Sequence, residues 1–458
     1  MASSKSSPPG FVFSILIIIS FFNFVTCNNQ HILSSCNFDA IYQLGDSIAD
    51  TGNDVQDNPS SKFARLPYGE TFKKATGRCS DGLLMIDYIA LSAGIPFLDP
   101  YLNKDGLFDY GLNFAFAGAT AMSAEDLAKW NVSFVPTSIS LSRQLDWMFS
   151  YFNTTCRGNK ALEVLYLVDC FKKNGKALFM VGEIGGNDYN YAFWQGKTIE
   201  EVKTMVPEVV ETIKQATKRV IGYGATRLVV PGNFPIGCFP VYLTKYQTDD
   251  STAYDELHCL KELNNFSIYH NYLLQQAIAE LKEEHPDETV VYGDYYNAFL
   301  WLLSKADCLV LIQYHCKRLA AELGETTIMA YQVGAEIQKY RHLLQQAIAE
   351  LKEKHQDVIV VYGYYYNAFL WLLSKADLLG FDPTSLQKAC CGIGDYNSGL
   401  SSWCGDPKVP VCENPNERLS WDGAHLAQRA YELMATWLVR GISPKLQCEY
   451  IVSYSSAV

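Results

Sequence analysis

The chain has 458 residues, of which 48% are hydrophobic and 19% charged, a balance typical of a folded globular protein and not of a disordered one. Its length allows one large α/β domain or two smaller ones. The formal net charge is −12 and no long basic run occurs, so we do not expect nucleic acid as a partner.

The first 27 residues have the pattern of a secretory signal peptide and are not expected to join the fold. Lys5 supplies a basic start, residues 11–22 are a short apolar stretch, and Val25-Thr26-Cys27 offers small residues for cleavage. The apolar stretch is too short for a comfortable membrane span, and no later stretch is long enough. We therefore expect a secreted protein with no membrane span.

The cysteine count agrees with an oxidising compartment. Of fourteen cysteines one lies in the leader, and the remaining thirteen are an odd number, so at least one thiol is free or paired with another chain. No spacing typical of a zinc site occurs. Closeness in sequence suggests Cys156 with Cys170, and Cys404 with Cys412, as disulfides. Glycosylation sequons begin at Asn131, Asn153 and Asn265.

The first expected element of the fold is a buried strand at residues 40–44, an apolar run that stops at Gly45. Asp46 and Ser47, which follow, are turn and helix-cap residue types. Open α/β sheets place their chemistry at the carboxyl ends of strands, where the backbone N–H of Ser47 would face an oxyanion. The alternative is that Ser47 merely caps a helix.

Strands and helices then alternate along the chain. We expect helices at residues 81–94, 141–152 and 198–222, and strands at 111–120, 177–181 and 227–230. This alternation predicts βαβ units and a mostly parallel sheet. The strands end in glycines or other small residues, which would gather at one edge of the sheet. This clustering favours a functional role for Ser47 over a helix-capping role.

An internal duplication follows, in which residues 273–307 and 343–377 are near-identical and each reads as helix, strand and helix. The copies differ only at Glu284/Lys354, Pro286/Gln356, Glu288/Val358, Thr289/Ile359 and Asp294/Tyr364. Two copies are too few for a solenoid, so this is either a local duplication or a gene model that kept two alternative exons. We expect the first copy to supply the sheet, because it continues the helix that begins near Leu260. A hybrid of the two copies is the alternative, since only the second runs directly into residues 381–383.

Near the carboxyl end, His425 lies three residues after Asp422, before a helical run that reaches Arg440. A nucleophilic serine needs a base, and the base needs a partner that fixes its tautomer. Asp422 and His425 could supply both roles. The alternative is a surface helix cap with a solvated imidazole.

Taken together, four blocks in this order resemble the plant GDSL esterases/lipases of the SGNH hydrolase superfamily. They are GDSIADTGN at 45–53, NFAFAGA at 113–119, GEIGGND at 182–188 and WDGAH at 421–425. The strings at 67–70, 76–82 and 231–238 also fit the plant branch, and those at 264–269 and 410–415 resemble its acetylajmalan esterase-like branch. The resemblance covers nearly all of 36–445, apart from about one copy of the duplication.

The resemblance implies a three-layer α/β/α fold with a mostly parallel sheet, flavodoxin-like, in a single domain over residues 28–458. It implies Ser47 as nucleophile, His425 as general base and then acid, and Asp422 as the residue that orients His425. The backbone N–H groups of Ser47 and Gly118 and the side-chain amide of Asn187 would form the oxyanion hole. No metal or organic cofactor is implied.

The expected function is that of a secreted carboxylic ester hydrolase, extracellular in the apoplast or vacuolar. Its substrates would be acetyl or short acyl esters of small plant metabolites, and we expect a monomer. The alternatives are a lipid acyl hydrolase or an acyltransferase with the same triad, or a non-catalytic product of a defective gene model. Asp188 is expected to be a turn cap. The remaining histidines near the repeat are expected to be structural or surface residues: His270, His285, His315, His342 and His355.

Overall fold

The computed structural model describes residues 29–156, 176–286, 289–293, 379–399 and 402–446. It divides the chain into one unit of Met1–Leu300 with Gln387–Val458 and another of Trp301–Leu386. Everything below concerns the first unit. The second copy of the duplication and residues 1–28 lie outside the described residues.

The centre of this unit is a five-stranded sheet in the order β2-β1-β3-β4-β5, and every pair is parallel. Its strands are β1 (Ala40–Leu44), β2 (Gly111–Asn113), β3 (Ala177–Val181), β4 (Arg227–Pro231) and β5 (Thr289–Gly293). Strands β1 and β3 are buried throughout, as expected for strands covered on both faces. The predicted parallel α/β fold is confirmed, and the strand at the far edge, β5, comes from the first copy of the duplication.

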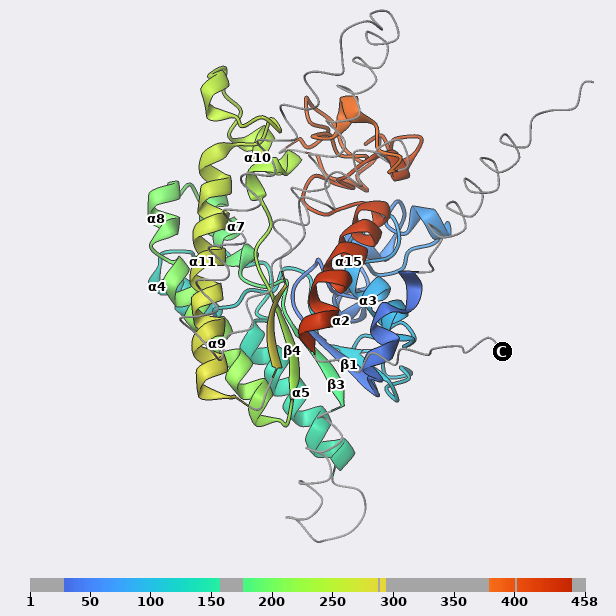
Figure 1. The fold of residues 1–458 in the computed structure, drawn as a ribbon. Helices are drawn as coiled ribbons and strands as arrows, with labels where there is room; N and C mark the ends of the chain where they lie inside the picture. The colour runs from blue at the N-terminus through green and yellow to red at the C-terminus, as the bar shows by residue number, and fades with distance from the viewer. Residues whose placement is uncertain (1–28, 157–175, 287–288, 294–378, 400–401, 447–458) are drawn as a thin grey trace, which may run out of the picture. The chain divides into compact units, whose positions relative to one another are not determined.

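The handedness of parallel connections explains how the helices divide between the two faces. Right-handed crossovers place helices on opposite faces when the chain moves in opposite directions across the sheet. From β1 the chain moves outward to β2, and α3 (Met85–Ala93) lies on one face with α15 (Gln428–Ile442) against it. From β2 the chain moves back toward β5, and α5 (Leu141–Cys156), α9 (Val206–Gly222) and α11 (Lys261–Glu284) cover the other face (Figure 1).

Shorter helices complete the unit. The α-helical ones are α2 (Asn53–Asp57), α4 (Ala124–Lys129), α7 (Gly186–Trp194), α8 (Ile199–Lys203) and α10 (Pro240–Lys245). The 3-10 helices are η1 (Asn29–Cys36), η2 (Lys62–Ala64), η3 (Glu70–Phe72), η4 (Ile236–Cys238), η5 (Ser251–Ala253), η8 (Pro415–Glu417) and η9 (Ser443–Leu446).

The long helix predicted at 198–222 is in fact two helices, α8 and α9. Thr198 caps α8, and α9 begins at Val206 with Pro207 in its first turn. Proline has no N–H to continue an existing helix but fits the start of a new one. The helix predicted at 81–94 begins only at Met85, because the Asp81 carboxylate accepts hydrogen bonds from the Thr71 hydroxyl and the Gln428 N–H instead of starting a helical turn.

The predicted pairing of Cys404 with Cys412 is wrong. Cys404 bonds to Cys391 and Cys412 bonds to Cys390. The segments around Cys391 and Val411 run antiparallel and the Cys412 N–H donates to the Cys390 carbonyl, so the nearest sulfur is across this bridge and not along the chain. A further disulfide joins Cys238 to Cys259. Cys79 is free and buried in the described part of the chain, and Cys170 lies outside it.

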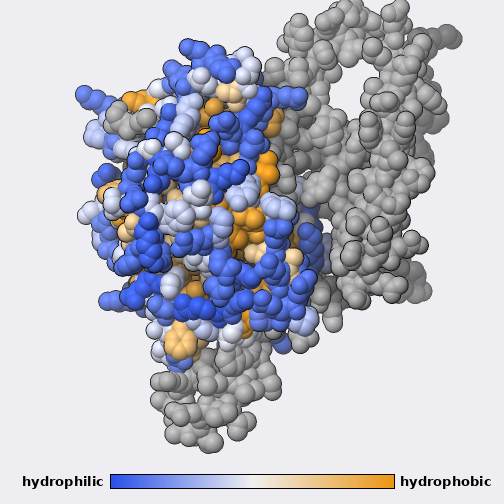
Figure 2. Space-filling model, turned by 90° about the vertical axis from the view of Figure 1, so that its left-hand side faces the viewer, coloured by the Kyte–Doolittle hydropathy of each residue, from blue (hydrophilic) through white to orange (hydrophobic). Residues whose placement is uncertain are grey.

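The exposed side of the α9 and α11 layer is largely hydrophilic (Figure 2). Ion pairs Lys214–Glu280 and Lys218–Glu284 join the two helices there. Such a surface is expected for amphipathic helices that bury their apolar sides against a sheet. Within the described ranges, no helix is both long and apolar enough to cross a membrane.

Candidate active site

The loops after β1, β2 and β3 meet at the carboxyl edge of the sheet, next to the point where the chain reverses its direction across it. Open α/β sheets bind ligands at such switch points. Gly45 begins the first loop with a φ of +153°, and a Cβ there would lie 2.4 Å from the carbonyl oxygen of Gly182. The two strands can therefore approach this closely only with glycine at position 45. The side chain of Gln144 holds the turn from α5 by bonding both the N–H and the carbonyl of Gly45.

Ser47, His425 and Asp422 form a continuous hydrogen-bonded chain. The Nε2 atom of His425 lies 2.9 Å from the Oγ of Ser47, and its Nδ1 lies 2.8 Å from Oδ2 of Asp422. Ser47 and His425 are 378 positions apart, so the fold brings these predicted residues together. With Nδ1 protonated toward the carboxylate, Nε2 is left to accept the serine proton.

The carboxylate of Asp422 is held by several donors in a buried site. Besides the imidazole, Oδ2 accepts from the hydroxyl of Tyr68 at 2.8 Å, and Oδ1 accepts from the backbone N–H groups of Ala424 and His425. Burial by itself would raise the pKa of Asp422. The charge and hydrogen bond of His425, with smaller contributions from Lys62 and Tyr68, outweigh burial and hold the pKa below its ordinary value. Asp422 is therefore ionised at neutral pH.

Tyr68 is fully buried in a cluster with Trp421 and three cysteines of the two carboxyl-terminal disulfides. We call this group the cystine cluster: Tyr68, Cys390, Cys391, Cys404 and Trp421, with Phe63, Val409 and Cys412 packed against it. Burial, and then the charge of Asp422, raise the pKa of Tyr68 well above its ordinary value, so its hydroxyl stays a donor. The ring of Phe63 meets both Tyr68 and His425 edge to face.

Ser47, Gly118 and Asn187, the residues expected to supply the oxyanion donors, all line one pocket. In the described residues, neither the backbone N–H of Ser47 nor that of Gly118 has an acceptor. Gly118 has a φ of +84°, a conformation that favours glycine, and its carbonyl accepts from the Tyr191 hydroxyl. The side-chain amide of Asn187 donates to the Ala119 carbonyl at 3.0 Å and lies 3.4 Å from Oδ2 of Asp46.

Two buried carboxyl groups tie these loops together. Asp50 accepts hydrogen bonds from four backbone N–H groups, among them that of Ala117, the residue before Gly118. Asp188 accepts from the N–H groups of Ala121 and Met122, which agrees with its expected role as a turn cap. Burial is the largest influence on both, and it raises the pKa of Asp50 to about 6 and that of Asp188 to about 7 against these donors.

A pocket of about 780 Å³ opens over Ser47 and His425. This volume suits a small organic molecule. Eight aromatic residues are among those that line the pocket: Phe63, Phe134, Tyr191, Trp194, Phe234, Phe239, Tyr242 and Trp403. Polar groups among its other walls include Lys62, Asn190 and Gln195. The pocket can therefore hold an apolar body while a few polar groups orient it.

Among the residues that the structure describes, the other histidines near the repeat have structural or surface positions. His270 is buried and bonded to the Tyr189 hydroxyl at 2.7 Å, as expected for a structural residue, and His285 is half-buried at the end of α11. His315, His342 and His355 lie outside the described residues. No group of three or more His, Cys, Asp or Glu residues in the described ranges could hold a metal ion. That no cofactor is required stays a prediction.

Sequence reasoning missed the residues that hold the site. Tyr68 is 354 positions from Asp422 and was noted only as part of a string. Asp50 lay only inside the first block, although an Asp side chain commonly accepts from the backbone N–H two residues further on, as it does here from Gly52. Asn190 and Tyr242, which bond to each other, gave no signal at all.

Comparison with known proteins finds relatives of one enzyme family. Residues 41–308 match the family model described as GDSL-like Lipase/Acylhydrolase. The chain is 36% identical to acetylajmalan esterase 1 of Rauvolfia serpentina over 443 residues, which are 96% of this chain and 94% of that protein. It is 32% identical to a GDSL esterase/lipase of Arabidopsis thaliana over 436 residues, 95% of this chain and 97% of that protein.

Proposed function

We propose a mechanism for this chain, which belongs to the GDSL-like lipase/acylhydrolase family of carboxylic ester hydrolases. It cleaves esters through Ser47, His425 and Asp422. The observation that carries the proposal is the hydrogen-bonded chain between these residues, with a distance of 2.9 Å between the Oγ of Ser47 and Nε2 of His425. A serine so placed can lose its proton to the imidazole as it attacks.

In the first half of the reaction, Ser47 Oγ attacks the ester carbonyl while His425 Nε2 takes the serine proton. The carbonyl oxygen becomes an oxyanion, which accepts from the N–H groups of Ser47 and Gly118 and from the amide of Asn187. Each such donor contributes about 3 kcal/mol to stabilisation of the transition state. As the intermediate collapses, His425 gives its proton to the departing alcohol oxygen, and the acyl group remains on Ser47.

In the second half, water takes the place of the alcohol. His425 removes a proton from water as the oxygen attacks the acyl carbon, and the same donors hold the second oxyanion. Collapse releases the carboxylic acid and returns the proton from His425 to Ser47. Asp422 stays ionised throughout and stabilises the imidazolium form of His425.

For the substrate, we propose acetyl or other short acyl esters of small metabolites. The pocket volume and its aromatic walls support a compact, rigid alcohol part. Three relatives at 36% identity carry the name acetylajmalan esterase, which also favours an acetyl group. The disulfides and the predicted signal peptide support secretion, to the apoplast or the vacuole. We expect the protein to act as a monomer.

The test of the mechanism is Ser47→Ala in the full chain, purified from a secreting host. Hydrolysis of p-nitrophenyl acetate should fall by about 10⁶-fold, to the background rate, while the thermal unfolding transition stays in place. Ser60→Ala, a change at an exposed serine of the neighbouring loop, is the matched control and should leave the rate unchanged. Turnover by Ser47→Ala near the wild-type rate would rule out Ser47 as the nucleophile.

The test of the substrate class is a series of p-nitrophenyl esters from acetate to palmitate. We expect kcat/KM to be highest for the shortest acyl chains. A maximum at long chains would instead identify a lipid acyl hydrolase. A small alcohol added to the reaction distinguishes hydrolysis from acyl transfer, which uses the same triad. Hydrolysis gives free acid and acyl transfer gives a new ester of that alcohol, so the ratio of the two products is measured.

A further inference from the structure

The amide of Asn187 can act as a donor only if its nitrogen, and not its oxygen, faces the reacting carbonyl. We infer that Asn190 and Tyr242 are positioning residues that fix this orientation through a chain of hydrogen bonds that ends at Asn187. The inference rests on the proposed function and deepens it, because it assigns a role in the same site to two residues that do not touch the triad.

The chain of bonds begins on α10 and crosses to α7. The hydroxyl of Tyr242 donates to Oδ1 of Asn190. The amide nitrogen of Asn190 then donates to Oδ1 of Asn187 at 3.0 Å, and the amide nitrogen of Asn187 donates to the Ala119 carbonyl at 3.0 Å. Asn187 and Asn190 are three residues apart on α7, where side chains share a face.

The far end of the chain sets the direction of every bond in it. The Ala119 carbonyl is only an acceptor, so Asn187 must present its nitrogen there. Its oxygen therefore faces Asn190, which must donate, and the oxygen of Asn190 in turn faces Tyr242, whose hydroxyl must donate. Reversing any one amide would bring two acceptors or two donors together. The three side chains thus have one satisfied arrangement.

This arrangement leaves one N–H of Asn187 for the oxyanion. The amide nitrogen of Asn187 also lies 3.4 Å from Oδ2 of Asp46, which is long for a hydrogen bond. Burial raises the pKa of Asp46 well above its ordinary value, which favours the neutral carboxyl. A neutral carboxyl is a weaker acceptor than an oxyanion, so the developing charge on the substrate can take this hydrogen.

Tyr242 is suited to a fixed donor role because α10 is held on several sides. The residue is buried, and burial, followed by the influence of Tyr246, raises the pKa of its hydroxyl well above the ordinary value. The N–H of Val241 donates to the carbonyl of Gly423 at 3.2 Å. Helix α10 therefore contacts the loop that carries Asp422 and His425 as well as the chain that ends at Asn187.

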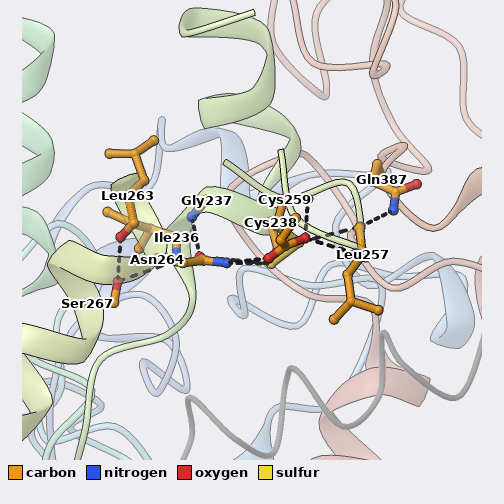
Figure 3. The surroundings of a disulfide bond; sticks show 10 residues. Ile236, Gly237, Cys238, Leu257, Cys259, Leu263, Asn264, Ser267 and Gln387 are labelled. Atoms are coloured by element: carbon orange, nitrogen blue, oxygen red, sulfur yellow. Dashed lines mark hydrogen bonds between the residues drawn. A yellow bond between two sulfur atoms is a disulfide. The ribbon is translucent and has the colours of Figure 1, made fainter. Parts of the chain in front are cut away.

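The segment before α10 is anchored by a disulfide. Cys238 in η4 bonds to Cys259, just before α11, and the Gly237 N–H donates to Oδ1 of Asn264 (Figure 3). Figure 3 also shows the Ile236 N–H directed at the Ser267 hydroxyl, so three successive residues of η4 are tied to α11 or its start. This anchor fixes where α10 begins and hence where Tyr242 points.

Four variants of the full chain test the inference, with short-chain ester hydrolysis as the assay. Asn187→Ala should lower kcat by about 10²–10³-fold. Tyr242→Phe, which keeps the ring in the pocket wall, should lower kcat roughly three- to tenfold with KM unchanged. Asn190→Asp places an acceptor opposite Oδ1 of Asn187 and should lower kcat more than Asn190→Ala does. A merely structural role would give the opposite order, because Asp is the closer match in shape.

Tyr246→Phe is the matched control, since Tyr246 stacks on Tyr242 but does not line the pocket; it should leave kcat unchanged. When Tyr242→Phe is added to Asn187→Ala, no further loss in kcat is expected, because the group that it positions is gone. If kcat is undiminished in Tyr242→Phe and Asn190→Asp but falls strongly in Asn187→Ala, the positioning role of Tyr242 and Asn190 is overturned. The proposed function would then still stand. No loss in Asn187→Ala itself would contradict its place in the oxyanion hole.

Discussion

The hydroxyl of Tyr68 is one of four donors that hold the Asp422 carboxylate, and it reaches that carboxylate from a distant part of the chain. A hydrogen bond to a charged group contributes about 1.5–3 kcal/mol. In the proposed mechanism Asp422 holds His425 in one tautomer and orientation. Removing this donor should therefore affect the chemical step more than substrate binding.

We therefore expect Tyr68→Phe to lower kcat about tenfold with little change in KM, because Tyr68 does not line the pocket. The readout is steady-state kinetics on a short-chain ester, with thermal unfolding measured in parallel. The neighbouring ring supplies a control, since Phe63→Leu should change KM as well through its place in the pocket wall. A Tyr68→Phe variant with unchanged kcat would show that the other three donors suffice.

At this scale the sequence predicted three residues that the fold brings together, Ser47, His425 and Asp422, and missed the residues that hold them. Ser47, His425 and Asp422 carry functional groups whose chemistry limits what they can do, so the motifs point to them directly. Tyr68, Asn190 and Tyr242 join the site through hydrogen bonds that the fold creates. A tyrosine or asparagine is a common residue with no distinctive spacing, and only the three-dimensional contact shows what it bonds to.

At the scale of single elements, the strands were predicted best. β1 and β3 begin and end where the apolar runs do, because strands buried on both faces read as continuous apolar sequence. The strand predicted at 111–120 is shorter, since β2 ends at Asn113. Beyond it Oδ1 of Asn113 accepts the Ala115 N–H, which starts the loop that carries Gly118. A side chain that bonds its own backbone in this way is not visible in an apolar pattern.

Helix α11 carries a buried histidine whose titration should affect stability. Burial lowers the pKa of His270 to about 4 from 6.5. Between these values the unfolded chain binds a proton that the folded chain does not, so stability is complete above pH 6.5 and is lost as the pH falls toward 4. The loss is on the order of 3 kcal/mol at full extent.

His270→Gln keeps a hydrogen-bond acceptor for Tyr189 but cannot be protonated in this range. We expect its free energy of unfolding to fall less than that of wild type between pH 7 and pH 5, as measured with urea at each pH. His31→Gln, at an exposed position of η1, is the control and should follow wild type. Equal losses for wild type and His270→Gln would mean that another group causes the acid sensitivity.

At the scale of the whole chain, the sequence shows a duplication but does not decide which copy supplies the strand of the sheet. β5 of the first copy pairs with β4 at the edge of the sheet, in register from Thr289 to Gly293. The candidate catalytic residues all lie before residue 273 or after residue 377. One copy of the repeat therefore suffices for the sheet and the site described above.

We expect a variant that lacks residues 308–377, which joins Asp307 to Leu378, to fold and to hydrolyse short-chain esters at least as fast as the full chain. Secretion yield and kcat/KM per mole of reactive serine are the measurements. The reciprocal deletion of 273–342 keeps the second copy, with Ile359 and Tyr364 in place of Thr289 and Asp294. If only the deletion of 273–342 is active, the native strand comes from the second copy. If a deletion variant is active and the full chain is not, the full chain is a non-catalytic product.

The cystine cluster links activity to disulfide formation. Tyr68 packs on cysteines that are joined in pairs, and its hydroxyl donates to the Asp422 carboxylate. Until Cys390 and Cys391 have met their partners, the support beneath Asp422 is incomplete. If Asp422 acts as proposed, catalytic competence is then acquired only by oxidation after synthesis, so a reducing agent should lower activity before it unfolds the sheet.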